Sequence, residues 1–236
     1  MEKLFRAAVN DSKLVFRDSS LRLFFVFPIL NLFVVSYGFP FVVKSFPVLE
    51  GYVNVLLMSA TMQGALVIGF IYSMVLVDEN DTGVAKVYGV LPVSQFWLVI
   101  FRLFVPFLFA ALSAFAILIV EPFYRLSILS NTLYSLLCGL TAPMMVLFVA
   151  IYSKNKIEAM TWQKLTNIPI SLPLLAFFVP ASYEILFAVF PSYWVYQAFQ
   201  QMTNHGNYAL FLFVGYAFSL VILVYLARKF TRSHFS

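Results

Sequence analysis

Six apolar runs, each long enough to cross a membrane, constrain what this chain of 236 residues can fold into. They lie near residues 22–43, 52–77, 96–120, 128–152, 164–187 and 208–227. A hydrocarbon core of about 30 Å takes roughly 20 helical residues to cross, and a helix satisfies its own backbone hydrogen bonds in lipid. The sequence therefore predicts an all-α membrane protein with six transmembrane helices, in one domain over residues 1–236.

The composition agrees with this class. The chain is 62% hydrophobic and 11% charged, whereas a soluble domain carries roughly 25% charged residues. Its net charge of +5 is not gathered into a basic run interleaved with aromatic residues, so we exclude nucleic-acid binding. The one cysteine, Cys138, cannot form a disulfide within the chain.

The distribution of Lys and Arg predicts the orientation. With the N-terminus inside, the outer connections hold only Lys44 and Arg125. The inner segments hold Lys3, Arg6, Lys13, Arg17, Arg22, Lys86, Lys154, Lys156, Lys164, Arg228, Lys229 and Arg232. By the positive-inside rule, both termini are expected in the cytoplasm.

Arg102 is the remaining cation, and it lies six residues into the third run. That position is roughly 9 Å deep at about 1.5 Å per residue. A long side chain near the inner end of a span can extend to the interface, and this is the expected arrangement. Pairing with the acidic segment that precedes the third run is the alternative.

The segment before the first run and the region around the fifth run differ from a plain transmembrane helix. Residues 3–20 repeat apolar side chains at helical spacing, which predicts an amphipathic helix in the inner interface. The fifth run contains Pro169, Pro173 and Pro180, and residues 181–207 are too apolar for a free loop. We expect a short re-entrant or interfacial helical segment on the outer side, before the last helix.

A polar segment, residues 78–94, interrupts the membrane domain between the second and third runs. Its acids do not form a calcium loop, because an alignment that starts at Asp78 puts Gly89 where a bidentate Glu is required. The spans hold few ionisable groups, which argues against catalysis and against ion-driven transport. No Gly-x-x-x-x-Gly-Lys-Ser/Thr loop is present, so the chain does not bind ATP by that route.

The polar segment resembles the connection between the second and third spans of ABC-2 type transporter permeases. An acidic cluster is followed by Gly83 and then by Leu-Pro-Val-Ser at 91–94. A second match begins with Asn-Lys-Ile-Glu-Ala at 155–159 and ends with Phe-Pro-Ser-Tyr-Trp at 190–194. The six runs and the N-terminal helix agree with that family, so the resemblance covers nearly the whole chain.

The resemblance implies a bacterial inner-membrane, multi-pass exporter subunit that forms a homodimer or heterodimer and recruits a cytoplasmic ABC ATPase. ATP and Mg would be held by that partner, and this chain would need no cofactor or metal and be no enzyme.

Residues 84–91 would form the coupling helix, with Gly83 and Pro92 at its ends and Asp81 as its N-cap. The coupling loop would comprise Asp78, Glu79, Asp81, Gly83, Lys86, Tyr88, Pro92 and Ser94. Asn155, Lys156 and Glu158 would make a second cytoplasmic contact. Gly89 departs from the family, which prefers a good helix former there.

The same resemblance places the first, second and fifth spans around a cavity on the dimer axis. The polar candidates for a solute path are then Asn31, Asn54, Thr61, Gln63, Asn167 and Ser171. Ordinary hydrogen bonding between helices is the alternative role for such side chains. The spans offer few polar side chains that could bind a solute, so an apolar or amphipathic solute is expected. Membrane lipid is expected to surround the spans. A non-transporting immunity, sensory or assembly protein remains the alternative function.

Overall fold

A computed structural model describes residues 2–84 and 94–234, which form helices without strands. The first half contains α1 (Glu2–Arg17), α2 (Ser19–Phe24), α3 (Val26–Phe33), the π-helical η1 (Val34–Gly38), α4 (Phe39–Ser45), the 3-10 helix η2 (Pro47–Tyr52), α5 (Val53–Asp81) and α7 (Gln95–Val120). The second half contains α8 (Ile128–Gly139), α9 (Thr141–Tyr152), α10 (Lys156–Ser171), η3 (Leu172–Phe178), α11 (Ala181–Glu184), η4 (Ile185–Val189), α12 (Pro191–Thr203) and α13 (Tyr208–His234).

Five helical stretches among the described residues are long and apolar enough to span a membrane. They are Ser19–Ser45, Pro47–Asp81, Gln95–Val120, Ile128–Tyr152 and Tyr208–His234. Six had been predicted, and the run at 164–187 is the one not found among them. The helix there starts earlier, at Lys156, and its first turns are polar.

The run at 164–187 is also not one helix. Pro173 lies where α10 gives way to η3, and the chain turns at Val179 and Pro180. A proline lacks the N–H that would continue an α-helix. The segments α11 and η4 then fold back against η3, and α12 packs against α13. Residues 181–207 are thus mostly helical, as expected, while their re-entry into a membrane stays a prediction.

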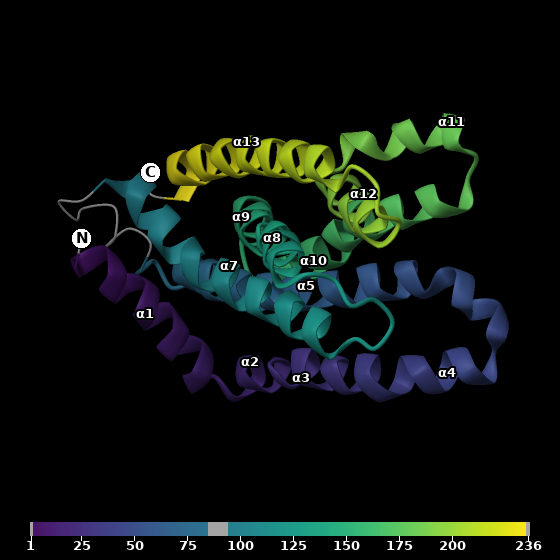
Figure 1. The fold of residues 1–236 in the computed structure, drawn as a ribbon. Helices are drawn as coiled ribbons and strands as arrows, with labels where there is room; N and C mark the ends of the chain where they lie inside the picture. Colours follow the sequence, from purple (N-terminus) through teal and green to yellow (C-terminus); the bar gives the residue numbers. More distant parts are fainter. Residues whose placement is uncertain (1, 85–93, 235–236) are drawn as a thin grey trace.

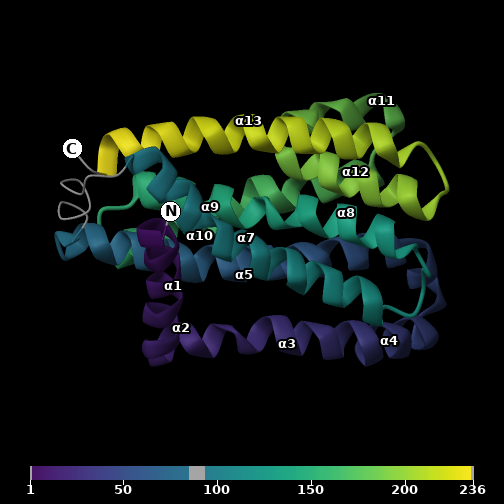
Figure 2. The same ribbon diagram turned by 60° about the vertical axis from the view of Figure 1, so that its left-hand side comes forward.

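Both chain termini lie at one end of an elongated bundle (Figures 1 and 2). We call it the terminal end, and the opposite one the distal end. The last turn of α5, the first turn of α7 and the start of α10 also lie at the terminal end. Five crossings alone would leave the two termini at opposite ends of the bundle. The segments α10 and η3 are not among the five stretches, but they also run from the terminal end along the bundle, and so both termini lie at the same end.

The N-terminal helix α1 lies across the direction of the long helices at the terminal end (Figure 2). It contacts α5 and α7. Asp18 separates it from α2, because the Asp18 carboxylate accepts hydrogen bonds from the backbone N–H groups of Ser20 and Leu21 at 2.9 and 3.2 Å. Such an N-cap starts a new helix in a new direction. The predicted amphipathic helix at 3–20 is confirmed as a helix, one turn shorter at its C-terminal end.

The core is built mainly on α5, α8 and α9. In the most apolar 18 residues of each stretch, 78% of the residues are buried for the stretch that contains α5 and 83% for the stretch that contains α8 and α9. The corresponding shares are 17% for Ser19–Ser45 and 22% for α13. Large apolar side chains therefore cover the outside of α2–α4, including Phe27, Phe33, Tyr37 and Phe41. An outward apolar surface of this kind is what a lipid-facing or partner-facing helix presents.

Candidate functional site: a buried charge network at the terminal end

The most unusual polar feature of the described residues is a buried ion network around Arg102 on α7. The Arg102 Nε and Nη2 atoms donate to the two carboxylate oxygens of Asp11 at 2.6 and 2.9 Å. Its Nη1 and Nη2 atoms donate to those of Glu79 at 2.9 and 2.5 Å. One planar guanidinium thus holds two carboxylates bidentately, a geometry that a lysine cannot reproduce.

All three side chains are shielded from the surroundings. Asp11, Glu79 and Arg102 are 2%, 5% and 3% exposed. The residual cavity beside them is only about 10 Å³, near the lower limit for one water molecule. Burial raises the pKa of the Asp11 carboxyl above its ordinary value, and the adjacent guanidinium acts in the opposite direction.

The network joins three elements that are distant in the sequence. Asp11 comes from α1, Glu79 from the last turn of α5, and Arg102 from the second turn of α7. A second link between α1 and α5 is the hydrogen bond of 3.0 Å between the Ser12 and Tyr72 hydroxyls. The polar segment 78–94 therefore begins at a point where α1, α5 and α7 are held together.

The alternative for Arg102, pairing with the acidic segment, is confirmed through Glu79, and the expectation that it extends to the interface is wrong. The physical reason is that two carboxylates lie within hydrogen-bonding distance of the guanidinium, and they stabilise its charge inside the bundle. Glu79 is correspondingly buried, so it is not presented to a partner as part of a solvent-facing loop. Asp11 was missed. It lies one helical turn before the fully buried Val15 on α1, and a carboxylate on that apolar face was the signal available.

A comparison with known proteins identifies the family of this chain. The family model described as fluoroquinolones export permease protein Rv2686c-like matches residues 11–227. The chain belongs to this family. Within the Rv2686c-like family, two proteins of Mycobacterium tuberculosis are similar to it: fluoroquinolones export permease protein MT2760 of strain CDC 1551 / Oshkosh and fluoroquinolones export permease protein Rv2686c of strain ATCC 25618 / H37Rv. Each is 22% identical over 241 residues, which cover 95% of this chain and 92% of the relative. No solved structure matches the chain.

As a member of the Rv2686c-like permeases, the chain is a multi-pass membrane protein. Its second span is longer than predicted, because α5 continues to Asp81. Asp78 and Asp81 thus belong to the last turn of a helix and not to a loop. Gly83 follows with a φ of +75°, which is the left-handed conformation that ends many helices and favours glycine.

Most of the predicted coupling helix at 84–91 lies outside the described residues, together with Lys86, Tyr88 and Pro92. The interpretation of Asp81 as its N-cap stays a prediction for the same reason. Ser94 is the N-cap residue of α7, with extended backbone but without a side-chain cap bond. The structure therefore describes both borders of the polar segment.

The second predicted cytoplasmic contact lies beside the first. The Asn155 side chain caps α10 by accepting from the Glu158 N–H at 2.9 Å, and the Glu158 carboxylate accepts from the Lys154 N–H at 2.9 Å. This reciprocal pattern fixes the start of α10. Lys156 Nζ then lies 2.7 Å from the Asp78 carboxylate, in a half-exposed ion pair. Two motifs that are far apart in the sequence meet at the terminal end.

The predicted solute-path residues do not form one surface. Asn31 donates to the Ala60 carbonyl at 2.8 Å, and Asn54 donates to the Gln200 side chain at 2.9 Å. The fully buried Thr61 hydroxyl bonds to the Met58 carbonyl and the Tyr134 hydroxyl. These three fit the alternative of hydrogen bonding between helices.

The other three solute-path candidates lie nearer the surface. Gln63 and Ser171 are exposed, and Asn167 is partly buried. Gln63 belongs to α5, and Asn167 and Ser171 belong to α10, which packs against α5. They remain candidates for a path along that side of the bundle.

Proposed function

We propose that this protein is the membrane-spanning permease subunit of an ATP-driven ABC exporter of the ABC-2 type. A separate cytoplasmic subunit would hydrolyse ATP, and the permease would move its solute by alternating access. Membership of an export permease family supports the transport role. The observation that carries the coupling role is the Arg102 network, which joins α1, α5 and α7 at the base of the polar segment.

The network supports coupling because it makes three elements move together. A buried ion pair is costly to break, at about 3–5 kcal/mol when one partner is removed. A displacement of the 78–94 segment would therefore reach α7 through Glu79 and Arg102, and α1 through Asp11. The Asp78–Lys156 ion pair extends the same connection to α10.

A cleft at the terminal end supports the position of the ATPase. Its volume is about 510 Å³, and it lies between α1, the end of α5 and the start of α10. Besides the buried Glu79, its polar lining consists of Asn10, Arg17, Asp18, Asp78, Thr82 and Lys156. Charges of both signs suit a polar contact with a soluble subunit. We propose that the ATPase docks beside this cleft, on the cytoplasmic side of a bacterial inner membrane, where both termini also lie.

The outer apolar face of α2–α4 supports assembly with a second permease chain. Ser19–Ser45 is the least buried of the five candidate spans, and its Asn31 side chain already bonds back to α5. A homodimer or heterodimer would cover part of this face, and lipid would cover the rest. The solute is proposed to be apolar or amphipathic, and the names of the relatives make a fluoroquinolone the first compound to test.

The test is reconstitution with a candidate ABC ATPase subunit, sought first among the products of the neighbouring genes. The pair is co-expressed, purified and placed in liposomes, and ATP hydrolysis and ATP-dependent norfloxacin accumulation are measured. We expect Asp81→Lys and Gly83→Pro to abolish stimulated hydrolysis. Glu50→Lys is the matched control, because it reverses an exposed acid in η2, away from the network.

A complex that remains intact and active after both changes would remove the coupling role from this segment. A chain that binds no ATPase and drives no accumulation would favour the alternative, a non-transporting immunity, sensory or assembly protein.

A further inference from the structure

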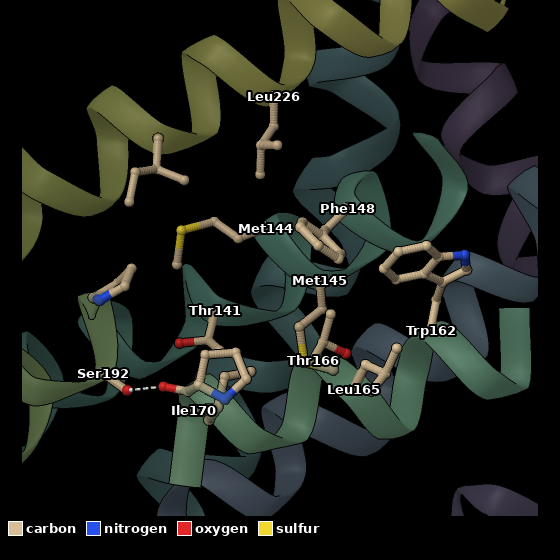
Figure 3. Close-up of a pocket in the computed structure, with 13 residues that line it drawn as sticks. Thr141, Met144, Met145, Phe148, Trp162, Leu165, Thr166, Ile170, Ser192 and Leu226 are labelled. Carbon is tan, nitrogen blue, oxygen red and sulfur yellow. Dashed lines mark hydrogen bonds between the residues drawn. The ribbon is translucent and has the colours of Figure 1, made fainter. Parts of the chain in front are cut away.

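An apolar cavity of about 180 Å³ lies among α9, α10, α12 and α13 (Figure 3). We call it the Met144–Trp162 pocket. Its lining is mostly apolar, with Met144, Met145, Phe148, Trp162, Leu165 and Leu226 among its members, and it includes three residues with hydroxyl groups. It is separate from the charge network and shares none of the predicted solute-path residues.

The prolines of α10 and η3 leave backbone carbonyls that attach α12 beside the pocket. Pro173 has no N–H, so the Pro169 carbonyl loses its helical donor, and the Ser192 hydroxyl donates to it instead at 3.1 Å. The Tyr196 hydroxyl donates to the neighbouring Ile170 carbonyl at 2.9 Å. These two bonds attach α12 to α10 and close one end of the pocket. Both α10 and α13 pack on α9, and residues of both helices line the pocket.

The chemistry of the walls favours flat, polarisable molecules. Met144, Met145, Phe148 and Trp162 supply two thioethers and two aromatic rings, and the Phe148 and Trp162 rings meet edge to face at a centroid distance of 6.0 Å. Thioethers and aromatic rings both make favourable contacts with aromatic rings. Two of the three hydroxyls are engaged, since Ser192 bonds to Pro169 and Thr166 to the Gln163 carbonyl at 2.8 Å.

The size of the pocket sets the size of the occupant. An apolar protein cavity of about 150 Å³ stays dry and binds benzene. A pocket of about 180 Å³ therefore suits a ring system somewhat larger than one benzene ring. A larger solute would have to leave its charged substituents outside, because nearly all the lining is apolar.

The α10 side of the pocket reaches the outside of the bundle, because the lining includes an exposed residue of that helix. Leu165 in the lining is 48% exposed, and Ile222 and Leu226 belong to a candidate membrane span. Trp162 lies six residues from the start of α10, about 9 Å along the helix from the terminal end. In a membrane, a solute would enter sideways from the lipid leaflet nearer the terminal end.

We propose that the Met144–Trp162 pocket binds the fused aromatic rings of an exported solute that enters from the lipid. This inference rests on the proposed export function, and it deepens that function by assigning a site. A lipid acyl chain is disfavoured as the occupant, because lipid already surrounds it with equally apolar groups. Ordering a flexible chain in the pocket would also cost conformational freedom, whereas a rigid ring system loses little.

The test measures equilibrium binding of radiolabelled norfloxacin to the full chain in nanodiscs, without any ATPase. Leu226 points into the pocket (Figure 3), so Leu226→Trp fills it, and we expect binding at least about tenfold weaker. Leu220→Trp is the matched control on the same helix, because Leu220 is 47% exposed and does not line the pocket. Its binding should stay within about twofold of wild type. Trp162→Leu should weaken binding by about tenfold.

Two binding results would overturn the assignment: a wild-type chain that does not bind norfloxacin, or a Leu226→Trp chain that binds it as tightly as wild type. Loss of a co-purifying phospholipid in Leu226→Trp, with unchanged norfloxacin affinity, would assign the pocket to lipid instead. If Leu226→Trp is not monodisperse, Trp162→Leu and Met144→Ala decide the question.

The assay also separates the two proposals, since binding needs no partner. Weaker norfloxacin binding in Leu226→Trp would support the pocket, and a wild-type chain that stimulates no ATP hydrolysis in the same series would refute the ABC assignment alone. Full transport by Leu226→Trp would refute the pocket alone.

Discussion

The Arg102 guanidinium lies 2.6 Å from the Asp11 carboxylate, although 91 positions separate the two residues in the chain. This contact attaches the N-terminal helix to the third span of the bundle. Glu79, at the end of α5, completes the network and shares the Arg102 Nη2 atom with Asp11. The polar segment that connects α5 to α7 thus starts in a helical turn that is bound to the buried Arg102 of α7.

We expect Arg102→Met to lower the free energy of unfolding by about 3–5 kcal/mol, because it leaves two buried carboxylates without their counter-ion. Thermal unfolding in detergent, followed by size-exclusion chromatography, measures the change. Lys164→Met is the control, since Lys164 is exposed, and it should shift stability by less than about 0.5 kcal/mol. The triple variant Asp11→Asn, Glu79→Gln, Arg102→Met should recover part of the loss. A near-wild-type Arg102→Met protein would show that the network is not structural.

The Asp78–Lys156 ion pair should contribute much less to stability. Both side chains are about half exposed, and exposed pairs are worth roughly 0–1 kcal/mol. Lys156→Asp should therefore cost at most about 1 kcal/mol, and the swapped pair Asp78→Lys with Lys156→Asp should restore it. A double-mutant cycle on unfolding free energies isolates the interaction. A coupling energy of zero would mean that the pair does not hold α10 to α5.

Gly83→Ala should destabilise the protein by about 1–2 kcal/mol, because a residue with a Cβ is strained at a φ of +75°. Gly83→Asn should cost less, since Asn tolerates this conformation better. Gly51→Ala is the matched control, because no atom lies within 4 Å of the added Cβ and its φ is not in the left-handed region. Equal melting temperatures for the two alanine variants would argue against the left-handed end of α5.

Gly139→Ala tests the packing of α8 on α7. An added Cβ would lie 2.9 Å from the Ala111 Cβ and 3.0 Å from the Phe107 carbonyl oxygen. The backbone of α7 cannot yield as a flexible side chain can, so we expect a cost of about 1–3 kcal/mol from overpacking. Gly51→Ala again serves as the comparison in the same unfolding assay. A neutral result would show that the two helices separate freely at this point.

Much of the fold follows from patterns that are local in the sequence. Long apolar runs predict helices in lipid, and five of the predicted runs correspond to helical stretches long enough to span it. The structure of the run at 164–187 was harder to predict, because Pro173 and Pro180 interrupt its helix and the polar residues of α10 lower its mean hydropathy. The end of the second span was placed too early, since four polar residues in the last turn of α5 look like a loop.

The candidate site was only partly accessible to sequence reasoning. Asp78, Glu79 and Lys156 were singled out from two motifs, but nothing local indicated that Lys156 pairs with Asp78. Asp11 was missed because its partner is on another helix. The Met144–Trp162 pocket was missed as well, since its walls come from four elements whose residues look like ordinary apolar core.

By itself, the sequence determined that this chain is a helical membrane protein with an amphipathic N-terminal helix and one polar interruption. Hydropathy and helical periodicity are properties of neighbouring residues, and so they can be read along the chain. Only the tertiary structure decided that Arg102 is paired and buried, that two distant polar motifs meet, and that α9, α10, α12 and α13 enclose a cavity. These outcomes depend on which side chains of different helices come within a few ångströms of each other, and that depends on how the whole bundle packs.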